Sequence, residues 1–222
     1  MKYDRFLAVT ALAMTTIASA APASAEAGDV LLRVRGIYVT PNETSGDILP
    51  AFPGEGARLT DAVAPEVDVT YMASDHIGFE LIAATTKHDA RGVTGTTGAL
   101  GDLVESWVLP PTVTVQYHLA PEAAVRPYIG AGLNYTLFWD EEAQDPLTGV
   151  AGPTRVELSD SFGWALQAGV DIDISERFFL NIDAKYIDMD TDVRLETTNV
   201  GVQRTRIDID PFVFGAGFGM KL

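Results

Sequence analysis

One group of residues in this 222-residue sequence has a spacing that is used elsewhere to bind phosphate. Gly215, Gly217 and Gly219 are spaced like a nucleotide-binding glycine loop. Such a loop holds phosphate at the start of a helix, whereas here the sequence ends three residues after Gly219. The phosphate site therefore cannot form, and we expect these glycines to line a narrow interior instead.

A second group consists of carboxylates with a calcium-loop spacing. Asp188, Asp190 and Asp192 follow the opening of an EF-hand, in which position six is glycine and position twelve is glutamate. Val193 and Asn199 occupy those two positions, which excludes an EF-hand. Two interpretations stay open: a solvated loop base, or carboxylates that bridge divalent cations to lipopolysaccharide phosphates.

The three histidines, His76, His88 and His118, show neither i, i+4 nor H-E-x-x-H spacing, so the sequence predicts no metal site. Some lipid-modifying enzymes use a Ser–His pair. The spacing leaves open a pair formed across strands, for instance by His88 with a hydroxyl residue. We nevertheless expect no catalytic residue, no cofactor and no enzyme activity.

Composition removes further classes of function. Lys and Arg number 15 against 31 Asp and Glu, a formal net charge of -16, and this acidity argues against a nucleic-acid partner. The absence of cysteine excludes disulfides, thiolate metal sites and a cysteine nucleophile. Because 47% of the residues are hydrophobic, a disordered chain is excluded too.

The first 25 residues predict a secretory signal peptide. Lys2 and Arg5 lie in a short charged start, residues 6–18 form an apolar run, and Ala23-Ser24-Ala25 is an A-x-A cleavage site. The run is shorter than the ~20 residues that a transmembrane helix requires. We therefore expect a signal peptide at 1–25 and a mature domain at 26–222 outside the cytoplasm.

The mature domain has the period of β-strands. From residue 161 to 174 apolar side chains such as Trp164 and Leu166 alternate with small or polar ones such as Gln167 and Asp171. The same alternation predicts eight strands, at 30–39, 66–73, 77–88, 112–118, 128–137, 161–174, 180–186 and 212–222.

The connections between these strands alternate in length. Tight turns are predicted at 74–76, 120–124 and 175–177, whereas 40–64, 89–105, 140–160 and 189–205 are rich in Gly, Pro, Asp, Glu and Thr, as expected of solvated loops. This pattern predicts an all-β fold: an eight-stranded antiparallel transmembrane β-barrel with short periplasmic turns and long extracellular loops.

A soluble, lipocalin-like barrel is the alternative, because it also has eight alternating strands. In that barrel Asp171, Asp183, Lys185 and many glycines would lie outside, whereas a membrane barrel places them in its lumen. Aromatic residues favour the membrane barrel because they form two belts. The turn side has Tyr71, Phe79, Tyr117, Phe178 and Phe218, and the loop side has Tyr38, Trp107, Tyr135, Trp164, Tyr186 and Phe212.

Five ordered blocks of sequence also resemble a known family. They are RVRGI at 33–37, LIAATTKH at 81–88, WVLPPT at 107–112, RPYIGAGLNY at 126–135 and SFGWALQAG at 161–169. Together they resemble the OmpW family of eight-stranded outer-membrane proteins. The resemblance implies a narrow channel for small hydrophobic molecules. It also implies insertion by the barrel assembly machinery, which reads a terminal aromatic residue, whereas this chain ends in Leu222.

Strand alternation also assigns the residues that face the lumen. The periplasmic half collects polar side chains, which we expect to pair into a polar plug because an eight-stranded lumen has room only for side chains. These are Arg33, Arg35, Glu80, Gln116, His118, Arg126, Asp171, Asp173, Asn181, Asp183 and Lys185. The outer half forms an apolar pocket, with Ile37, Val39, Ile82, Ala84, Val108, Phe138, Ile209 and Val213.

This division predicts a passage in which a small hydrophobic solute enters from outside and leaves sideways into the bilayer. The alternative is a structural or surface-interaction barrel without transport activity. The expected partners are outer-membrane lipid and lipopolysaccharide, the solute and the assembly machinery; the oligomeric state stays undetermined.

Overall fold

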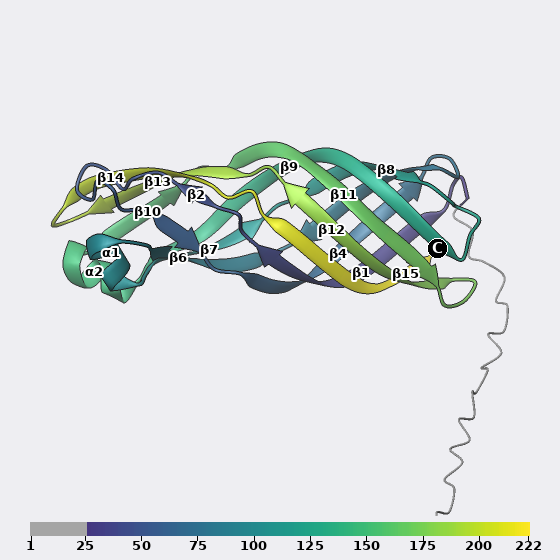
Figure 1. Ribbon diagram of the computed structural model, residues 1–222, viewed down its shortest axis with the longest axis horizontal. Coiled ribbons are helices and arrows are strands. Elements are labelled where there is room, and N and C mark those ends of the chain that lie inside the picture. Colours follow the sequence, from purple (N-terminus) through teal and green to yellow (C-terminus); the bar gives the residue numbers. More distant parts are fainter. Residues whose placement is uncertain (1–25) are drawn as a thin grey trace, which may run out of the picture.

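The computed structural model describes residues 26–222, so the predicted signal peptide lies outside the described residues. Eight strands form a closed antiparallel barrel (Figure 1). In barrel order they are β1 (Val30–Thr40), β4 (Ala62–Met72), β5 (Ile77–Ala84), β8 (Thr112–His118), β9 (Val125–Ala143), β11 (Ser161–Asp173), β12 (Phe178–Ile187) and β15 (Phe212–Lys221). Pairing of β15 with β1 closes the ring, which confirms the predicted fold class.

Beyond the barrel, the long connections continue as strands rather than as irregular loops. β6 (Thr86–Gly92) pairs with β7 (Asp102–Leu109), and β13 (Asp190–Thr197) pairs with both β10 (Thr154–Leu158) and β14 (Gly201–Asp208). Two short strands, β2 (Thr44–Ser45) and β3 (Ala57–Leu59), add to their edges. We call this part the extension; it lies at the end opposite the tight turns (Figure 1).

The extension corrects the prediction of solvated loops at 89–105, 140–160 and 189–205. Its strands form because apolar residues still alternate there: Val193, Leu195 and Ile207 point inward and are buried. Their outward neighbours, such as Arg194 and Glu196, form ion pairs at partly exposed positions, which gives the segment a loop-like composition. Acidic and Thr-rich composition therefore concealed a strand period of two.

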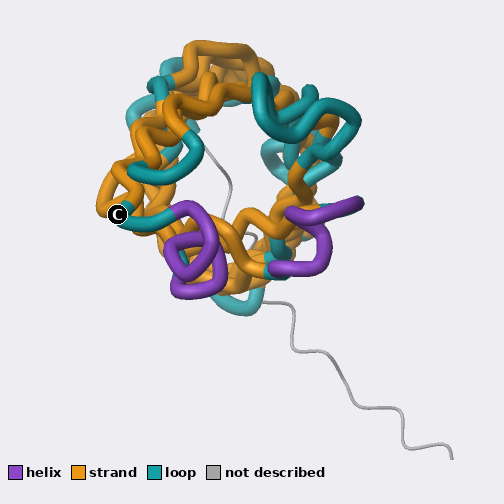
Figure 2. Tube along the Cα trace, turned by 90° about the vertical axis from the view of Figure 1, so that its left-hand side faces the viewer, coloured by secondary structure: helices purple, strands orange, loops and turns teal. Residues whose placement is uncertain are grey.

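Two short helices lie at the rim of the extension: α1 (Gly95–Leu100) and α2 (Asp145–Ala151) (Figure 2). Glu55 fixes α1, because its carboxylate accepts hydrogen bonds from the backbone N–H of Thr97 (2.7 Å) and of Thr96 (3.0 Å). These bonds stabilise the ionised form and lower the pKa of Glu55 below its usual value. No helix within residues 26–222 is long and apolar enough to cross a membrane.

The outer wall of the barrel is apolar. Leu81, Leu133 and Leu166 are about half exposed, although each is large and aliphatic, and the same holds for alternate residues of every barrel strand. Rings flank this band at both ends; on the loop side Tyr186 contacts Trp164 and Phe212 of the two neighbouring strands, with its ring centroid 5.3 Å from each of theirs. Such an exposed band between two aromatic belts is stable only against lipid.

Candidate functional site

The lumen beside the tight turns is filled by ion pairs, which we call the polar plug. Arg33 contacts Asp171 at 2.9 Å and Asp68 at 3.0 Å, and all three side chains are fully buried. Arg35 contacts Glu66 at 2.8 Å and Asp183 at 2.9 Å. Each arginine thus joins carboxylates from different strands, so the plug ties opposite walls of the barrel together.

The remaining cations complete the plug at its two ends. Lys185 contacts Asp183 at 2.7 Å and Glu66 at 2.8 Å on the side of the extension. Arg126 pairs with Asp173 near the tight turns. Among residues 26–222 the plug therefore contains four cations and six carboxylates: Arg33, Arg35, Arg126 and Lys185 with Glu66, Asp68, Glu80, Asp171, Asp173 and Asp183.

Small and aromatic residues make room for these charges. A Cβ atom on Gly219 would lie 2.2 Å from the ring of Phe179, and one on Gly215 would lie 2.3 Å from Asp183 Oδ1. Phe179 is fully buried, with the guanidinium carbons of Arg33 and Arg126 5.6 and 5.4 Å from its ring centroid. The glycines of the C-terminal strand therefore serve close packing inside the lumen.

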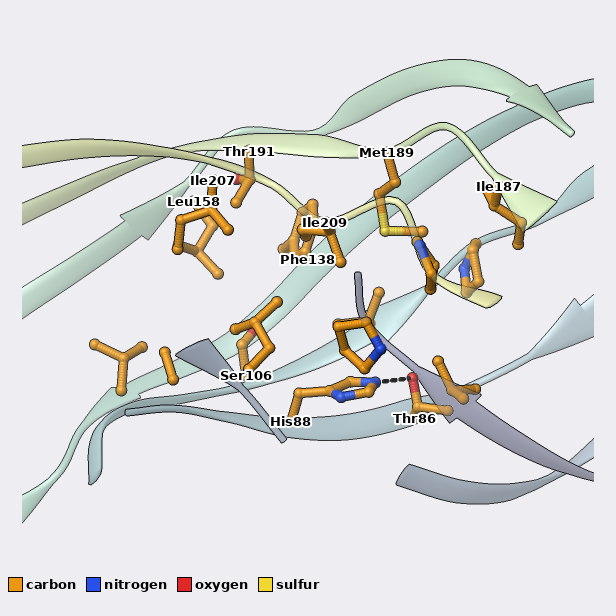
Figure 3. A pocket seen from close by; sticks show the side chains of 18 of the residues that line it. Thr86, His88, Ser106, Phe138, Leu158, Ile187, Met189, Thr191, Ile207 and Ile209 are labelled. Carbon is orange, nitrogen blue, oxygen red and sulfur yellow. Dashed lines mark hydrogen bonds between the residues drawn. The ribbon is translucent and has the colours of Figure 1, made fainter. Parts of the chain in front are cut away.

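Above the plug lies an apolar space of about 100 Å³, which we call the upper cavity. It extends from Glu66 and Lys185 at the plug to Leu103 and Leu195 in the extension. All eight side chains of the predicted apolar pocket line it: Ile37, Val39, Ile82, Ala84, Val108, Phe138, Ile209 and Val213. Figure 3 shows Phe138 and Ile209 on the wall opposite His88. The lumen thus changes from charged to apolar within one barrel.

All eleven polar lumen residues named from the sequence face the interior, and their side chains are nearly inaccessible. Sequence reasoning missed Glu66, Asp68 and Thr70 of β4, although they alternate with the exposed Val67, Val69 and Tyr71 and could have been found from that period. It also missed the cavity lining from the extension, because that segment was predicted to be solvated loop.

His88 lies apart from the other two histidines. His76 bonds the carbonyl of His118 near the turns, and His118 stacks on Tyr128 in the lumen. His88 lines the upper cavity, with Nδ1 2.7 Å from the Thr60 carbonyl oxygen and Nε2 2.9 Å from Thr86 Oγ1 (Figure 3). Within residues 26–222 no group of three or more His, Cys, Asp or Glu side chains is arranged to hold a metal ion.

The three carboxylates with calcium-loop spacing do not form a common site. Asp190 and Asp192 lie on the outer face of β13, since Thr191 and Val193 between and beyond them point inward. Arg206 of the neighbouring strand pairs with Asp190 at 2.9 Å. Asp190 and Asp192 therefore lie on a solvated, partly paired outer face.

An eight-stranded antiparallel barrel with an apolar outer band, two aromatic belts and a filled lumen is an outer-membrane β-barrel. A model of the OmpW family matches residues 26–222. Outer membrane protein W of Escherichia coli K12 is 36% identical over 215 residues, covering 96% of this chain and 98% of the relative. The chain belongs to the OmpW family, and it resides in the cell outer membrane.

Two further proteins are similar. The crystal structure of outer membrane protein OprG from Pseudomonas aeruginosa superposes with a TM-score of 0.83 and 31% identity, covering 90% of this chain and 99% of OprG. The dibenzothiophene metabolism operon protein PahQ of Pseudomonas aeruginosa is 30% identical over 175 residues, 76% of either chain. Two of these three relatives are named as outer membrane proteins and the third is named for an operon; none of the three names is that of an enzyme.

Proposed function

We propose that this barrel gives small hydrophobic molecules a passage from outside the cell into the outer membrane. The observation that carries the proposal is the upper cavity: an apolar space, formed mainly by aliphatic side chains, directly above a buried ionic plug. An apolar solute is stabilised in such a cavity by removal from water. The polar plug stops it there, because going further would separate buried ion pairs.

A solute that cannot pass the plug must leave sideways, and the strand pairing supports one place for that exit. β4 pairs with β5 from Met72 up to Glu66, which lies opposite Ala84. Hydrogen bonds across the same seam resume between Thr60 and Asp89. In the described chain no ladder joins the stretch between them, 62–65, to β6. We call this stretch the lateral window.

The residues of the lateral window are suited to an opening. Pro65 has no N–H for a ladder, and Ala64, which faces the lumen, is small. Val63 is 79% exposed on the outer wall. It lies opposite Tyr38, a residue of the aromatic belt on the loop side, so the window faces the outer leaflet near its interface.

The family supports the same class of solute. PahQ is named for dibenzothiophene metabolism, and dibenzothiophene is an uncharged, polycyclic aromatic molecule. The side chains of the upper cavity do not contact lipid, so the membrane does not account for their apolar character. A passage for apolar compounds does. We also propose lipopolysaccharide and the barrel assembly machinery as partners, because this chain belongs to a family of outer-membrane proteins.

Substitutions in the upper cavity test the proposal. Val108→Asp or Phe138→Asp places a carboxylate in the cavity, which must be buried or hydrated, and either lowers the affinity for an apolar solute. We expect uptake of a hydrophobic dye to fall at matched surface expression. Val202→Asp is the control, because Val202 is 40% exposed in β14 and does not line the cavity. Normal uptake by both cavity variants would instead support a structural or surface-interaction barrel.

A further inference from the structure

Hydroxyl groups that line the upper cavity share one property: each donates its proton to another atom of the protein. In the part of the chain that the structure describes, five Ser or Thr side chains line the cavity, namely Thr86, Ser106, Thr112, Thr191 and Thr205. Four of them donate to backbone carbonyl oxygens at 2.8 to 3.1 Å: those of Trp107, Pro110, Ser159 and Gly46. A carbonyl oxygen can only accept, so the direction of these four bonds is fixed.

The fifth hydroxyl, Thr86, donates to a histidine. The carbonyl oxygen of Thr60 accepts a bond from His88 Nδ1, so Nδ1 carries the proton. In the neutral imidazole Nε2 is then an acceptor, and its partner at 2.9 Å, Thr86 Oγ1, must donate (Figure 3). Both ring nitrogens and the Thr86 proton are therefore already in use.

Within residues 26–222, Lys185 is the charged hydrogen-bond donor of the cavity lining. Its ammonium group is paired with Glu66 and Asp183 where the cavity meets the plug. The side walls consequently present hydroxyl oxygens with unused lone pairs but no unused proton. Two of these hydroxyl groups, those of Thr86 and Ser106, lie on the paired strands β6 and β7. Ser106 is the register partner of His88, and Thr86 lies two residues from His88 on the same face of β6. We call Thr86, His88 and Ser106 the acceptor spot.

We propose that the upper cavity selects apolar molecules that carry one hydrogen-bond donor, such as alcohols and phenols, over ketones, ethers and esters of the same size. An alcohol that leaves water can donate to Thr86 or Ser106 and so replace the bond it lost. A ketone oxygen meets only acceptors on these walls, so its lost bond to water stays uncompensated. The inference names the solute class of the proposed passage and rests on that function.

Two variants test this selection by different changes, one that removes the acceptors and one that frees a donor, and both should shift the ratio of affinities toward the ketone. The triple variant Thr86→Val, His88→Leu, Ser106→Ala removes the acceptor spot, and we expect it to weaken binding of 1-heptanol about three- to tenfold with little effect on 2-heptanone. His88→Leu alone releases the Thr86 proton toward the cavity. It should tighten binding of 2-heptanone by a similar factor and leave 1-heptanol nearly unchanged.

The measurement is an NMR titration of methyl-labelled protein in nanodiscs, which follows Val108 and Ile37 methyl groups against free aqueous solute. The readout is the ratio of the two dissociation constants, so that solute hydration and lipid partitioning cancel between variants. Thr198→Val is the matched control, since Thr198 is exposed, donates to the Pro153 carbonyl and does not line the cavity. Its ratio should equal that of the unmodified protein.

Each outcome decides a different statement. A ratio that shifts toward the ketone in both variants supports the acceptor spot. If both solutes bind and the ratio is the same in every variant, the inference is wrong while the proposed passage stands. If neither solute perturbs the cavity methyls, both the inference and the proposed function fail. Should the triple variant not fold, as judged from its spectrum, His88→Leu alone carries the test.

Discussion

Removing a cation from the polar plug should lower the free energy of unfolding more than removing a carboxylate. Arg35 contacts Glu66, Asp68 and Asp183 at 2.8, 2.6 and 2.9 Å, with a side chain that is fully buried. Arg35→Met keeps much of the volume but leaves six buried carboxylates with three cations. Because removing one partner strands the charges that remain, we expect a loss of unfolding free energy of about 3 to 5 kcal/mol.

Asp183→Asn should cost less. It leaves five carboxylates with four cations, and Arg35 and Lys185 both keep Glu66 as a partner. The neutral amide can still accept a hydrogen bond, so we expect a loss of about 1 to 3 kcal/mol. Asp183→Ala removes that acceptor as well and should fall between the two other variants. The order of the three losses follows from the excess of carboxylates in the plug.

Equilibrium unfolding in urea, with the barrel in micelles, measures these differences. Trp139 and Trp164 are exposed on the outer wall and report the loss of structure without touching the plug. Arg206→Met is the matched control, since the Arg206 side chain is 59% exposed and its pair with Asp190 should contribute less than about 1 kcal/mol. A loss below about 0.5 kcal/mol for Arg35→Met, or a larger loss for Asp183→Asn, would refute the reasoning.

Two further predictions concern the wall and the rim. Leu166→Arg places a charge on the lipid-facing band and should destabilise the barrel by about 2 to 4 kcal/mol, whereas Gln167→Arg points into the carboxylate-rich lumen and should cost less; equal losses in urea unfolding would contradict the assignment of faces. At the rim, the lowered pKa of Glu55 means that its bonds to α1 persist above the usual value of 4.5 and are lost as the pH falls through the lower folded value. The Thr97 amide resonance should therefore titrate with a midpoint below 4.5, and Glu55→Gln should abolish the transition; a midpoint at or above 4.5 would contradict the carboxylate cap.

The barrel was predictable because two environments alternate along each strand. Between residues 161 and 173 lipid faces Trp164 and Leu166 while the lumen faces Gln167 and Asp171, so a period of two is visible in composition. In the extension water replaces lipid outside. The same period there alternates apolar with charged residues, and it was concealed by segments rich in Thr, Asp and Gly.

The partners within the plug were not predictable to the same degree. Alternation shows that Arg35 and Asp183 both point inward, but their meeting depends on the stagger of β1, β15 and β12 around the ring. A sequence does not reveal that stagger. The lateral window is hidden for a similar reason, because it arises where the pairing of β4 with β5 ends at Glu66 rather than from any motif.

The route through the upper cavity and out of the lateral window is tested most directly by closing the window. The chain has no cysteine, so we choose Val63→Cys with Lys87→Cys, two exposed positions on either side of the window, as a disulfide pair outside both the cavity and the plug. Val67→Cys with Ala83→Cys, register partners on the outer wall below the window, is the matched control. We predict that oxidation of the first pair lowers uptake of a hydrophobic dye and that reduction restores it, with no change in the control. Unchanged uptake with the first pair fully oxidised would contradict the sideways exit.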